Sequence, residues 1–305
     1  MKRTWKLAVA ALSLVTLLAG CSSAGSDSSD NGVSTPSSGN GTSASMSGTI
    51  SVISREDGSG TRGAFIELFG IEEKDSDGNK VDMTTEEASI TNNTAGMITN
   101  VSGDQKAIGY VSLGSLNNTV KAVKIDGNEA TVDNVKSGAY EVSRPFNIVT
   151  KDSLNDLAQD FVDFILSADG QKVIEDNKYI PLDNAPSFTS KKPSGKITVG
   201  GSSSVSPVMQ KLIEAYRNIN SGATIELQTH DSTTGVTSTI DGTFDIGMAS
   251  RELKDEETAK GVKSTKIAID GIAVIVNNEN SIENMSTDQV KSIFTGEITD
   301  WSEIA

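Results

Sequence analysis

The stretch SVISREDGSGTRGAFIELF, residues 51–69, combines a short apolar strand, a glycine-rich turn and the start of a helix. Gly58, Gly60 and Gly63 follow the spacing G-x-G-x-x-G, which cradles the pyrophosphate in dinucleotide-binding folds. Such a site also requires an acidic residue at the end of the next strand, about twenty residues further on. The segment at that distance, KDSDGNKVD, reads as a polar loop, and three charged residues separate the strand from Gly58. We therefore interpret the turn as a site for a smaller anion.

The same turn contains the donors that a free oxyanion needs. Arg55 offers a planar guanidinium group for two oxygens, and Asp57 can hold that group in place. Ser59 and Thr61 add hydroxyl groups, and Gly60 lets the backbone approach a ligand closely. The helix that follows directs its free N–H groups to the same point. The alternative is a surface ion pair beside a capped helix.

Two further strand–helix junctions later in the chain have the same composition. KITVGG is followed by SSSVSP, and TIELQTHD is followed by STTGV, so hydroxyl residues stand at each predicted helix start. Apolar strands alternate with helical stretches from residue 48 onward, which predicts an α/β architecture. A single serine at a helix start is usually only a cap, but three such corners together indicate an anion site.

The composition of this 305-residue chain excludes several function classes. A hydrophobic share of 36% and a charged share of 22% are typical of a folded globular protein, and the length suits two domains. The net charge of −15 leaves no basic stripe, so we expect no nucleic-acid partner. One cysteine and one histidine form no metal-ligand pattern, and we expect neither a metal nor a cofactor.

The beginning of the chain reads as an export signal followed by a spacer. Residues 1–20 combine a basic start with a short apolar run and are predicted to be a lipoprotein signal peptide. Leu-Ala-Gly-Cys at its end resembles the bacterial lipoprotein signal, which implies diacylglycerol on Cys21. Residues 21–47 are mostly serine and glycine and are expected to be a flexible linker. We therefore expect an exported protein that is lipid-anchored to the outer face of the cytoplasmic membrane.

Several motifs resemble those of the phosphate-binding proteins that feed the high-affinity phosphate ABC transporter. They are SREDGSGTRGAF, ITVGGSSSVSP, GTFDIGMASRELKDEE, IAIDGIAVIVN, FTGEITDW, AIGYVSLG and SADGQKVIEDNKYIPL, and the resemblance extends over essentially all of residues 48–305. The resemblance implies the two-lobed periplasmic-binding-protein fold of type II, a Venus-flytrap in which hinge strands join two closing lobes. In that family the ITVGGSSSVSP half comes first. This chain therefore looks circularly permuted, with residues 183–195 joining the usual ends.

The permuted order predicts two lobes, one formed by two separate segments of the chain and one formed by a single continuous segment. One lobe consists of residues 48–144 plus 271–305 and contains the SREDGSGTR loop. The other lobe, residues 145–270, is continuous and contains the GSSSVSP and DSTTGV loops. The chain is expected to cross the hinge twice, near Arg144 and near Gly271.

The resemblance also implies a set of phosphate ligands on these three loops. By position they are Arg55, Ser59, Gly60, Thr61, Ser203, Ser204 and Ser232. Asp57 matches the carboxylate that orients the arginine. Ser250 stands where some family members have an aspartate that accepts the proton of hydrogen phosphate, so Asp57 and Glu252 are the candidate acceptors here. Arg251 either adds charge to the cleft or lies on the surface.

The leading hypothesis is a monomeric, non-enzymatic receptor that captures inorganic phosphate and delivers it to a membrane-embedded ABC permease. The same fold could instead bind tungstate, molybdate or sulfate, or serve as a signalling or adhesive lipoprotein. An enzyme that uses Ser59 as a nucleophile is disfavoured, because D-G-S-G-T is not the G-x-S-x-G elbow. The single histidine, His230, reads as a strand-end residue rather than as a catalytic base.

Overall fold

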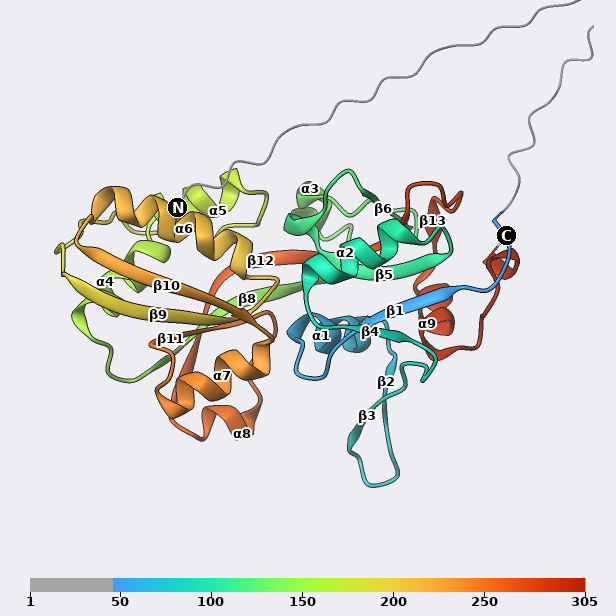
Figure 1. Cartoon of the computed structure of the whole chain (residues 1–305), viewed down its shortest axis with the longest axis horizontal. Coiled ribbons are helices and arrows are strands. Elements are labelled where there is room, and N and C mark those ends of the chain that lie inside the picture. Colours follow the sequence, from blue (N-terminus) through green and yellow to red (C-terminus); the bar gives the residue numbers. More distant parts are fainter. Residues whose placement is uncertain (1–45, 305) are drawn as a thin grey trace, which may run out of the picture. The chain divides into compact units, whose positions relative to one another are not determined.

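The structure, a computed structural model, describes residues 46–304 (Figure 1). The predicted signal peptide and Cys21 lie outside the described residues. Among residues 46–304, no helix combines the length and the apolar character that crossing a bilayer requires.

The central feature is a nine-stranded mixed sheet. Along the sheet the strands follow the order β10 (Ala223–His230), β9 (Gly195–Ser202), β11 (Ile246–Ala249), β8 (Ser143–Lys151), β12 (Val262–Asn277), β5 (Ala107–Ser112), β1 (Ser51–Arg55) and β4 (Ser89–Thr91), and β6 (Val120–Ala122) pairs with β12. Two small sheets pair β2 (Glu72–Lys74) with β3 (Lys80–Asp82) and β7 (Lys124–Ile125) with β13 (Asn284–Met285).

The helices connect these strands and cover the sheet. They are α1 (Gly60–Leu68), α2 (Thr94–Gly103), α3 (Val132–Ser137), α4 (Asp156–Ile165), α5 (Ala168–Asp176), α6 (Ser206–Ile219), α7 (Ser232–Asp241), α8 (Asp255–Thr258) and α9 (Thr287–Thr295), with 3₁₀ turns at Leu113–Ser115 and Trp301–Ile304. The α/β architecture predicted from the sequence is confirmed.

Two large separate hydrophobic cores divide the described residues into two lobes. The first lobe packs residues from 50–142 together with residues from 272–304, around Phe65 and Trp301. The second lobe packs residues from 146–268, around Phe161 and Tyr216. The two-lobed fold expected from the resemblance is therefore present.

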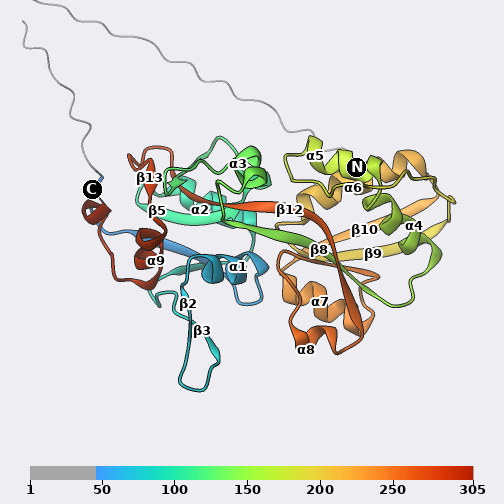
Figure 2. The ribbon, with the colours of Figure 1, turned by 180° about the vertical axis from the view of Figure 1, so that it is seen from behind.

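Strands β8 and β12 join the two lobes (Figures 1 and 2). They pair antiparallel from Val262 opposite Lys151 to Gly271 opposite Ser143. Beyond Gly271, β12 continues into the first lobe and pairs with β5. One strand of 16 residues thus belongs to both lobes, which makes this pair the hinge.

Helices cover both faces of the sheet in the first lobe. Neighbouring residues of β5 demonstrate this, because successive side chains of a strand point to opposite faces. Gly109 faces Met97 and Val101 of α2, whereas Tyr110 stacks on Phe65 of α1 with ring centroids 3.9 Å apart. Burial on both faces explains why β12 reads IAVIV, an apolar run without alternation.

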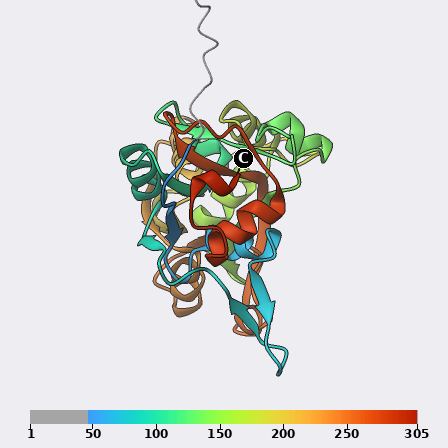
Figure 3. The same cartoon turned by 90° about the vertical axis from the view of Figure 1, so that its right-hand side faces the viewer.

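The two ends of the described chain lie side by side (Figures 1 and 3). Thr49 and Asp300 form a β-bridge, and the Ile50 amide donates to the Thr299 carbonyl at 2.8 Å. Buried Trp301 donates its backbone amide to the Gly48 carbonyl at 3.1 Å. The start of β1 and the C-terminal segment are therefore parts of one packing unit.

One local prediction differs from the structure. KDSDGNKVD is not a loop but the hairpin of β2 and β3, because the Asp75 carboxylate accepts the backbone amides of Asp77 and Asn79 and closes the turn. Helices α4 and α5 are separated at Ser167, whose side chain caps α5. Gly170 lies inside α5, where a Cβ would collide with backbone carbonyls of α4.

Candidate anion-binding site

Three strand–helix corners meet where the two lobes face each other. In the first lobe, the Ser59 hydroxyl caps α1 by accepting the Arg62 amide at 3.3 Å. In the second lobe, Asp231 caps α7 by accepting the Thr234 amide at 2.8 Å, and α6 has proline in its first turn. Each corner therefore presents a helix N-terminus, where free N–H groups and the helix dipole favour an anion.

The corners of the two lobes contact each other directly. Arg55 Nη2 donates to Ser203 Oγ at 3.1 Å, and the hydroxyls of Thr61 and Ser204 lie 2.7 Å apart. The Thr233 amide donates to the Gly58 carbonyl at 3.1 Å. The lobes are thus in contact through the same loops that the sequence singles out.

Gly60 lies at a close approach between the lobes. A Cβ at this position would lie 2.8 Å from Ser250 Oγ and would also overlap Ser232 Oγ. Gly58 has a positive φ of 83°, a conformation that favours glycine. By contrast, a Cβ on Gly63 would have no neighbour within 4 Å. The glycine spacing therefore serves the contact between lobes rather than a dinucleotide.

The predicted phosphate ligands are buried together in this contact. The buried set comprises Arg55, Ser59, Gly60, Thr61, Ser203, Ser204 and Ser232. Buried polar groups must find partners, and each hydroxyl of this set can donate a hydrogen bond while Arg55 adds a guanidinium group. An oxyanion is the ligand whose chemistry matches such a set.

Glu56, and not Asp57, orients Arg55. The Glu56 carboxylate accepts Arg55 Nε and Nη2, both at 2.7 Å. The Asp57 side chain is fully exposed and accepts Arg62 Nη1 at 3.0 Å. The prediction for Asp57 is wrong because the chain turns directly after β1. Residue 56 folds back along the arginine, while residue 57 points to solvent at the tip of the turn.

Ser250 belongs to a chain of buried serines in the second lobe. Its amide donates to Ser232 Oγ at 3.0 Å, and its hydroxyl accepts from Ser202 Oγ at 3.0 Å. Ser250 therefore lies beside the candidate ligand Ser232, but as a hydroxyl and not as a carboxylate.

The two charged residues after Ser250 have partners within the second lobe. Arg251 donates both terminal nitrogens to the Glu257 carboxylate at 2.8 Å. Glu252 accepts a long 3.4 Å hydrogen bond from Asn147. Arg251 also donates to Thr233 Oγ1 at 3.1 Å, so it stands at the rim of the α7 corner.

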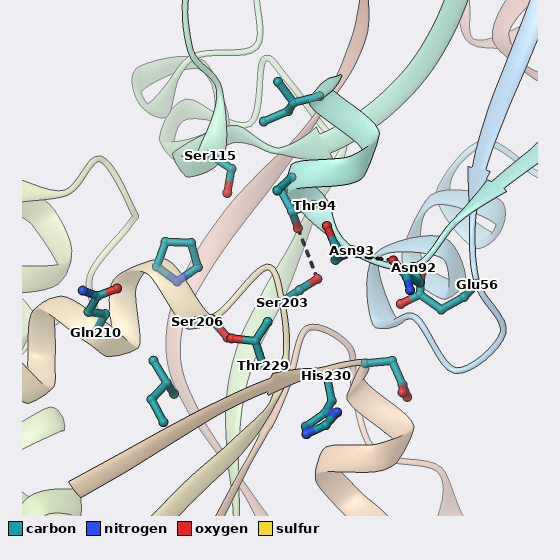
Figure 4. A pocket seen from close by; sticks show the side chains of 15 residues that line it. Glu56, Asn92, Asn93, Thr94, Ser115, Ser203, Ser206, Gln210, Thr229 and His230 are labelled. Atoms are coloured by element: carbon teal, nitrogen blue, oxygen red, sulfur yellow. Dashed lines mark hydrogen bonds between the residues drawn. The ribbon is translucent and has the colours of Figure 1, made fainter. Parts of the chain in front are cut away.

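Besides Glu56, two site residues were missed by the sequence analysis. Thr94, at the start of α2, places Oγ1 3.3 Å from Ser203 Oγ (Figure 4). Arg144, the second residue of β8, donates Nη2 to Thr61 Oγ1 at 3.0 Å. For Thr94, the signal was the helix start NNT. For Arg144, it was a charged residue directly before the apolar run PFNIV.

A cavity of about 870 Å³ opens beside these contacts and is lined by both lobes (Figure 4). The first lobe contributes Glu56 and Thr94, and the second contributes Ser203 and His230, the last residue of β10. Of the predicted ligands, only Ser203 lines it. The cavity is therefore the approach between the lobes, and most of the candidate ligands lie behind it.

Within residues 46–304, no group of three or more His, Cys, Asp or Glu side chains could hold a metal ion.

Comparisons with known proteins agree with this fold. Residues 35–169 and 186–305 match the model of the PBP superfamily domain. The "Phosphate-binding protein PstS 2" of Streptococcus agalactiae serotype V is 55% identical over 300 residues, which cover 98% of this chain and 97% of that protein. The crystal structure of a phosphate ABC transporter, phosphate-binding protein from Streptococcus pneumoniae TIGR4 is 48% identical with a TM-score of 0.67. It covers 85% of this chain and 100% of its own.

A more distant relative matches only part of the chain. The "Phosphate-binding protein PstS" of Bacillus subtilis is 33% identical over 115 residues, which cover 37% of this chain and 38% of that protein.

Proposed function

Because this chain belongs to the PBP superfamily and, within it, to the phosphate-binding proteins, we propose that it captures inorganic phosphate between its two lobes. In this proposal it is the solute-binding protein of an ABC importer. One observation carries the proposal: Arg55 and Thr61 of the first lobe contact Ser203 and Ser204 of the second. A phosphate ion held by both pairs would bridge the lobes and stabilise their contact.

The mechanism is binding without chemistry. Phosphate exchanges its water shell for hydroxyls, helix N-terminal amides and one guanidinium group that are already in place. Closure of the lobes excludes water, which strengthens each charge-assisted hydrogen bond. The ligand set proposed is Arg55, Ser59, Gly60, Thr61, Ser203, Ser204 and Ser232.

Ser250 bears on which anion is preferred. A carboxylate at this position would reward the proton of hydrogen phosphate and repel sulfate, which has no proton at neutral pH. A serine hydroxyl can accept a hydrogen bond from the proton of hydrogen phosphate, and it does not repel a fully ionised anion such as sulfate. We therefore propose that this chain excludes sulfate, tungstate and molybdate less strongly than a receptor that has an aspartate in place of Ser250.

Cys21 is proposed as the lipid anchor of the receptor. Diacylglycerol on its thiol would supply two acyl chains, enough to hold the protein on the outer face of the cytoplasmic membrane near its permease. Labelling with radioactive palmitate should mark the wild-type chain and leave Cys21→Ala unlabelled. Equal labelling of both chains would contradict this assignment.

The permuted chain order is proposed as a property of this branch of the family. The lobes would be residues 48–144 plus 271–305 and residues 145–270, with 183–195 as the joint between the former ends. Two observations support it. The two ends of the described chain pair with each other through Thr49 and Asp300. A collinear comparison with the Bacillus subtilis protein matches only 37% of this chain, as expected when two halves are exchanged.

Calorimetric titration tests the proposed ligand. Residues 47–305, freed of bound anion, are titrated with phosphate, sulfate and tungstate at pH 7. Tight phosphate binding supports the receptor. A preference for tungstate or sulfate keeps the fold and changes the ligand, and silence for all three favours a signalling or adhesive lipoprotein.

A further inference from the structure

A second arginine lies buried behind the proposed ligands. Arg144 of β8 and Asp270 of β12 are opposite each other in the hinge, and both side chains are nearly inaccessible to solvent. Their closest approach, Nη2 to Oδ2, is 3.4 Å. Among the described residues, every buried side-chain nitrogen or oxygen without a hydrogen-bond partner belongs to the cluster around this pair. The residues concerned are Arg144, Asp270, Tyr179, Ser112 and Ser115.

The two buried arginines differ in how well their charges are compensated. Arg55 is bound by both oxygens of Glu56 at 2.7 Å. Arg144 has only the distant Asp270 oxygen, and its Nε and Nη1 have no partner. Burial, together with the nearby charge of Arg55 and against the opposing effect of Asp270, lowers the pKa of Arg144 to about 10. The two guanidinium groups thus repel each other, and Arg144 stays positively charged at neutral pH.

Arg144 reaches the proposed site through Thr61. Its Nη2 donates to Thr61 Oγ1 at 3.0 Å, so this oxygen already accepts a hydrogen bond. The Thr61 hydroxyl keeps its own hydrogen, which it can donate to an anion at that point. Between Thr61 Oγ1 and Ser204 Oγ, which lie 2.7 Å apart, either hydroxyl can be the donor. A charged donor behind a hydroxyl also polarises it and strengthens the bond that it donates.

We propose that Arg144 is a positioning residue of the anion site, which turns the Thr61 hydroxyl into a donor and adds a second buried positive charge behind it. Asp270 lies opposite Arg144 and neutralises its charge only in part. The ligand favoured by this arrangement is a tetrahedral oxyanion that carries two negative charges. This inference rests on the proposed function, because its measure is phosphate affinity.

The test measures phosphate affinity by calorimetry in four variants of residues 47–305. Arg144→Gln should weaken phosphate binding by about tenfold or more, because a charge-assisted contact is lost. Arg144→Lys, which keeps the charge, should recover part of the affinity. Asp270→Asn should bind at least as tightly as the wild type, because Arg144 then keeps its charge with less compensation. Tyr179→Phe, in the same buried cluster, is the matched control and should bind normally.

A double-mutant cycle separates positioning from a merely structural role. If Arg144 acts through Thr61, the losses in Arg144→Gln and Thr61→Val should be clearly less than additive. Additive losses, or wild-type affinity in a folded Arg144→Gln variant, would overturn the inference and leave the proposed function intact. Weaker binding in Asp270→Asn would also overturn it, because the intact ion pair would then be what matters. A wild-type chain that does not bind phosphate would overturn both proposals.

Discussion

The guanidinium group of Arg55 donates to the hydroxyl of Ser203 at 3.1 Å, although 148 positions separate the two residues in the chain. Arg55 ends β1 in the first lobe, and Ser203 follows β9 in the second. The contact exists only while the lobes are together. A ligand held between these two groups is therefore bound by the closed arrangement and released when the lobes separate.

Arg55→Ala should weaken phosphate binding by about tenfold or more, because it removes a buried positive charge that directly contacts the opposite lobe. Calorimetric titration measures the effect. Arg217→Ala is the matched control, since Arg217 donates to the Ile225 carbonyl in the second lobe and touches none of the proposed ligands. Unchanged affinity in Arg55→Ala would remove this residue from the site.

Gly60→Ala should weaken phosphate binding because the added methyl group would collide with Ser232 and Ser250 and hold the lobes apart. The matched control is Gly63→Ala in the same helix, where a Cβ meets nothing within 4 Å. That variant should bind phosphate normally. Its free energy of unfolding should be about 1 kcal/mol higher, since alanine has a higher helix propensity than glycine. Equal affinities in the two variants would show that closure does not bring α1 against these serines.

The stability of the protein should depend on Asp270 between about pH 4 and pH 6. Burial raises the pKa of this carboxyl to about 6, from an ordinary value of 3.8. In this window the folded chain holds a proton that the unfolded chain has lost. The free energy of unfolding contributed by Asp270 therefore falls as the pH rises to about 6 and then stays constant.

Denaturant unfolding of the wild type and Asp270→Asn across this range checks the sign. The stability of the wild type relative to the variant should decrease with rising pH, by about 3 kcal/mol at most. Arg144 and Tyr179, which face Asp270, keep their protons throughout the range. A difference that stays flat or increases with pH would contradict the raised pKa.

A rearranged chain tests the proposed permutation. Residues 196–304, followed by a short glycine-serine linker and residues 46–190, should fold and bind phosphate like the original chain. The expectation follows because residues near Gly48 and Asp300 are already paired, the Gly48 amide donating to Asp300 Oδ1 at 3.0 Å. Phosphate titration and thermal unfolding measure the outcome. An unfolded product would show that an uninterrupted connector 183–195 is essential and that this segment does more than join the two halves.

Much of the site was predictable because its parts are local. The caps at Ser59 and Asp231 and the glycine turn at Gly58 are encoded within a few neighbouring residues. The choice between Glu56 and Asp57 was not predictable, since both follow Arg55 and only the direction of the turn separates them. The same limit applied to KDSDGNKVD, whose polar composition concealed a hairpin closed by its own side chains.

The sequence by itself determined that three strand–turn–helix corners with anion-binding donors exist in an α/β chain, because turn, cap and strand signals act over short distances. Only the tertiary structure decided which donors meet. The contacts of Arg55 with Ser203 and of Arg144 with Thr61 join distant segments. They depend on the register of β8 with β12 and on the packing of two lobes, which arise from many weak interactions at once rather than from any local motif.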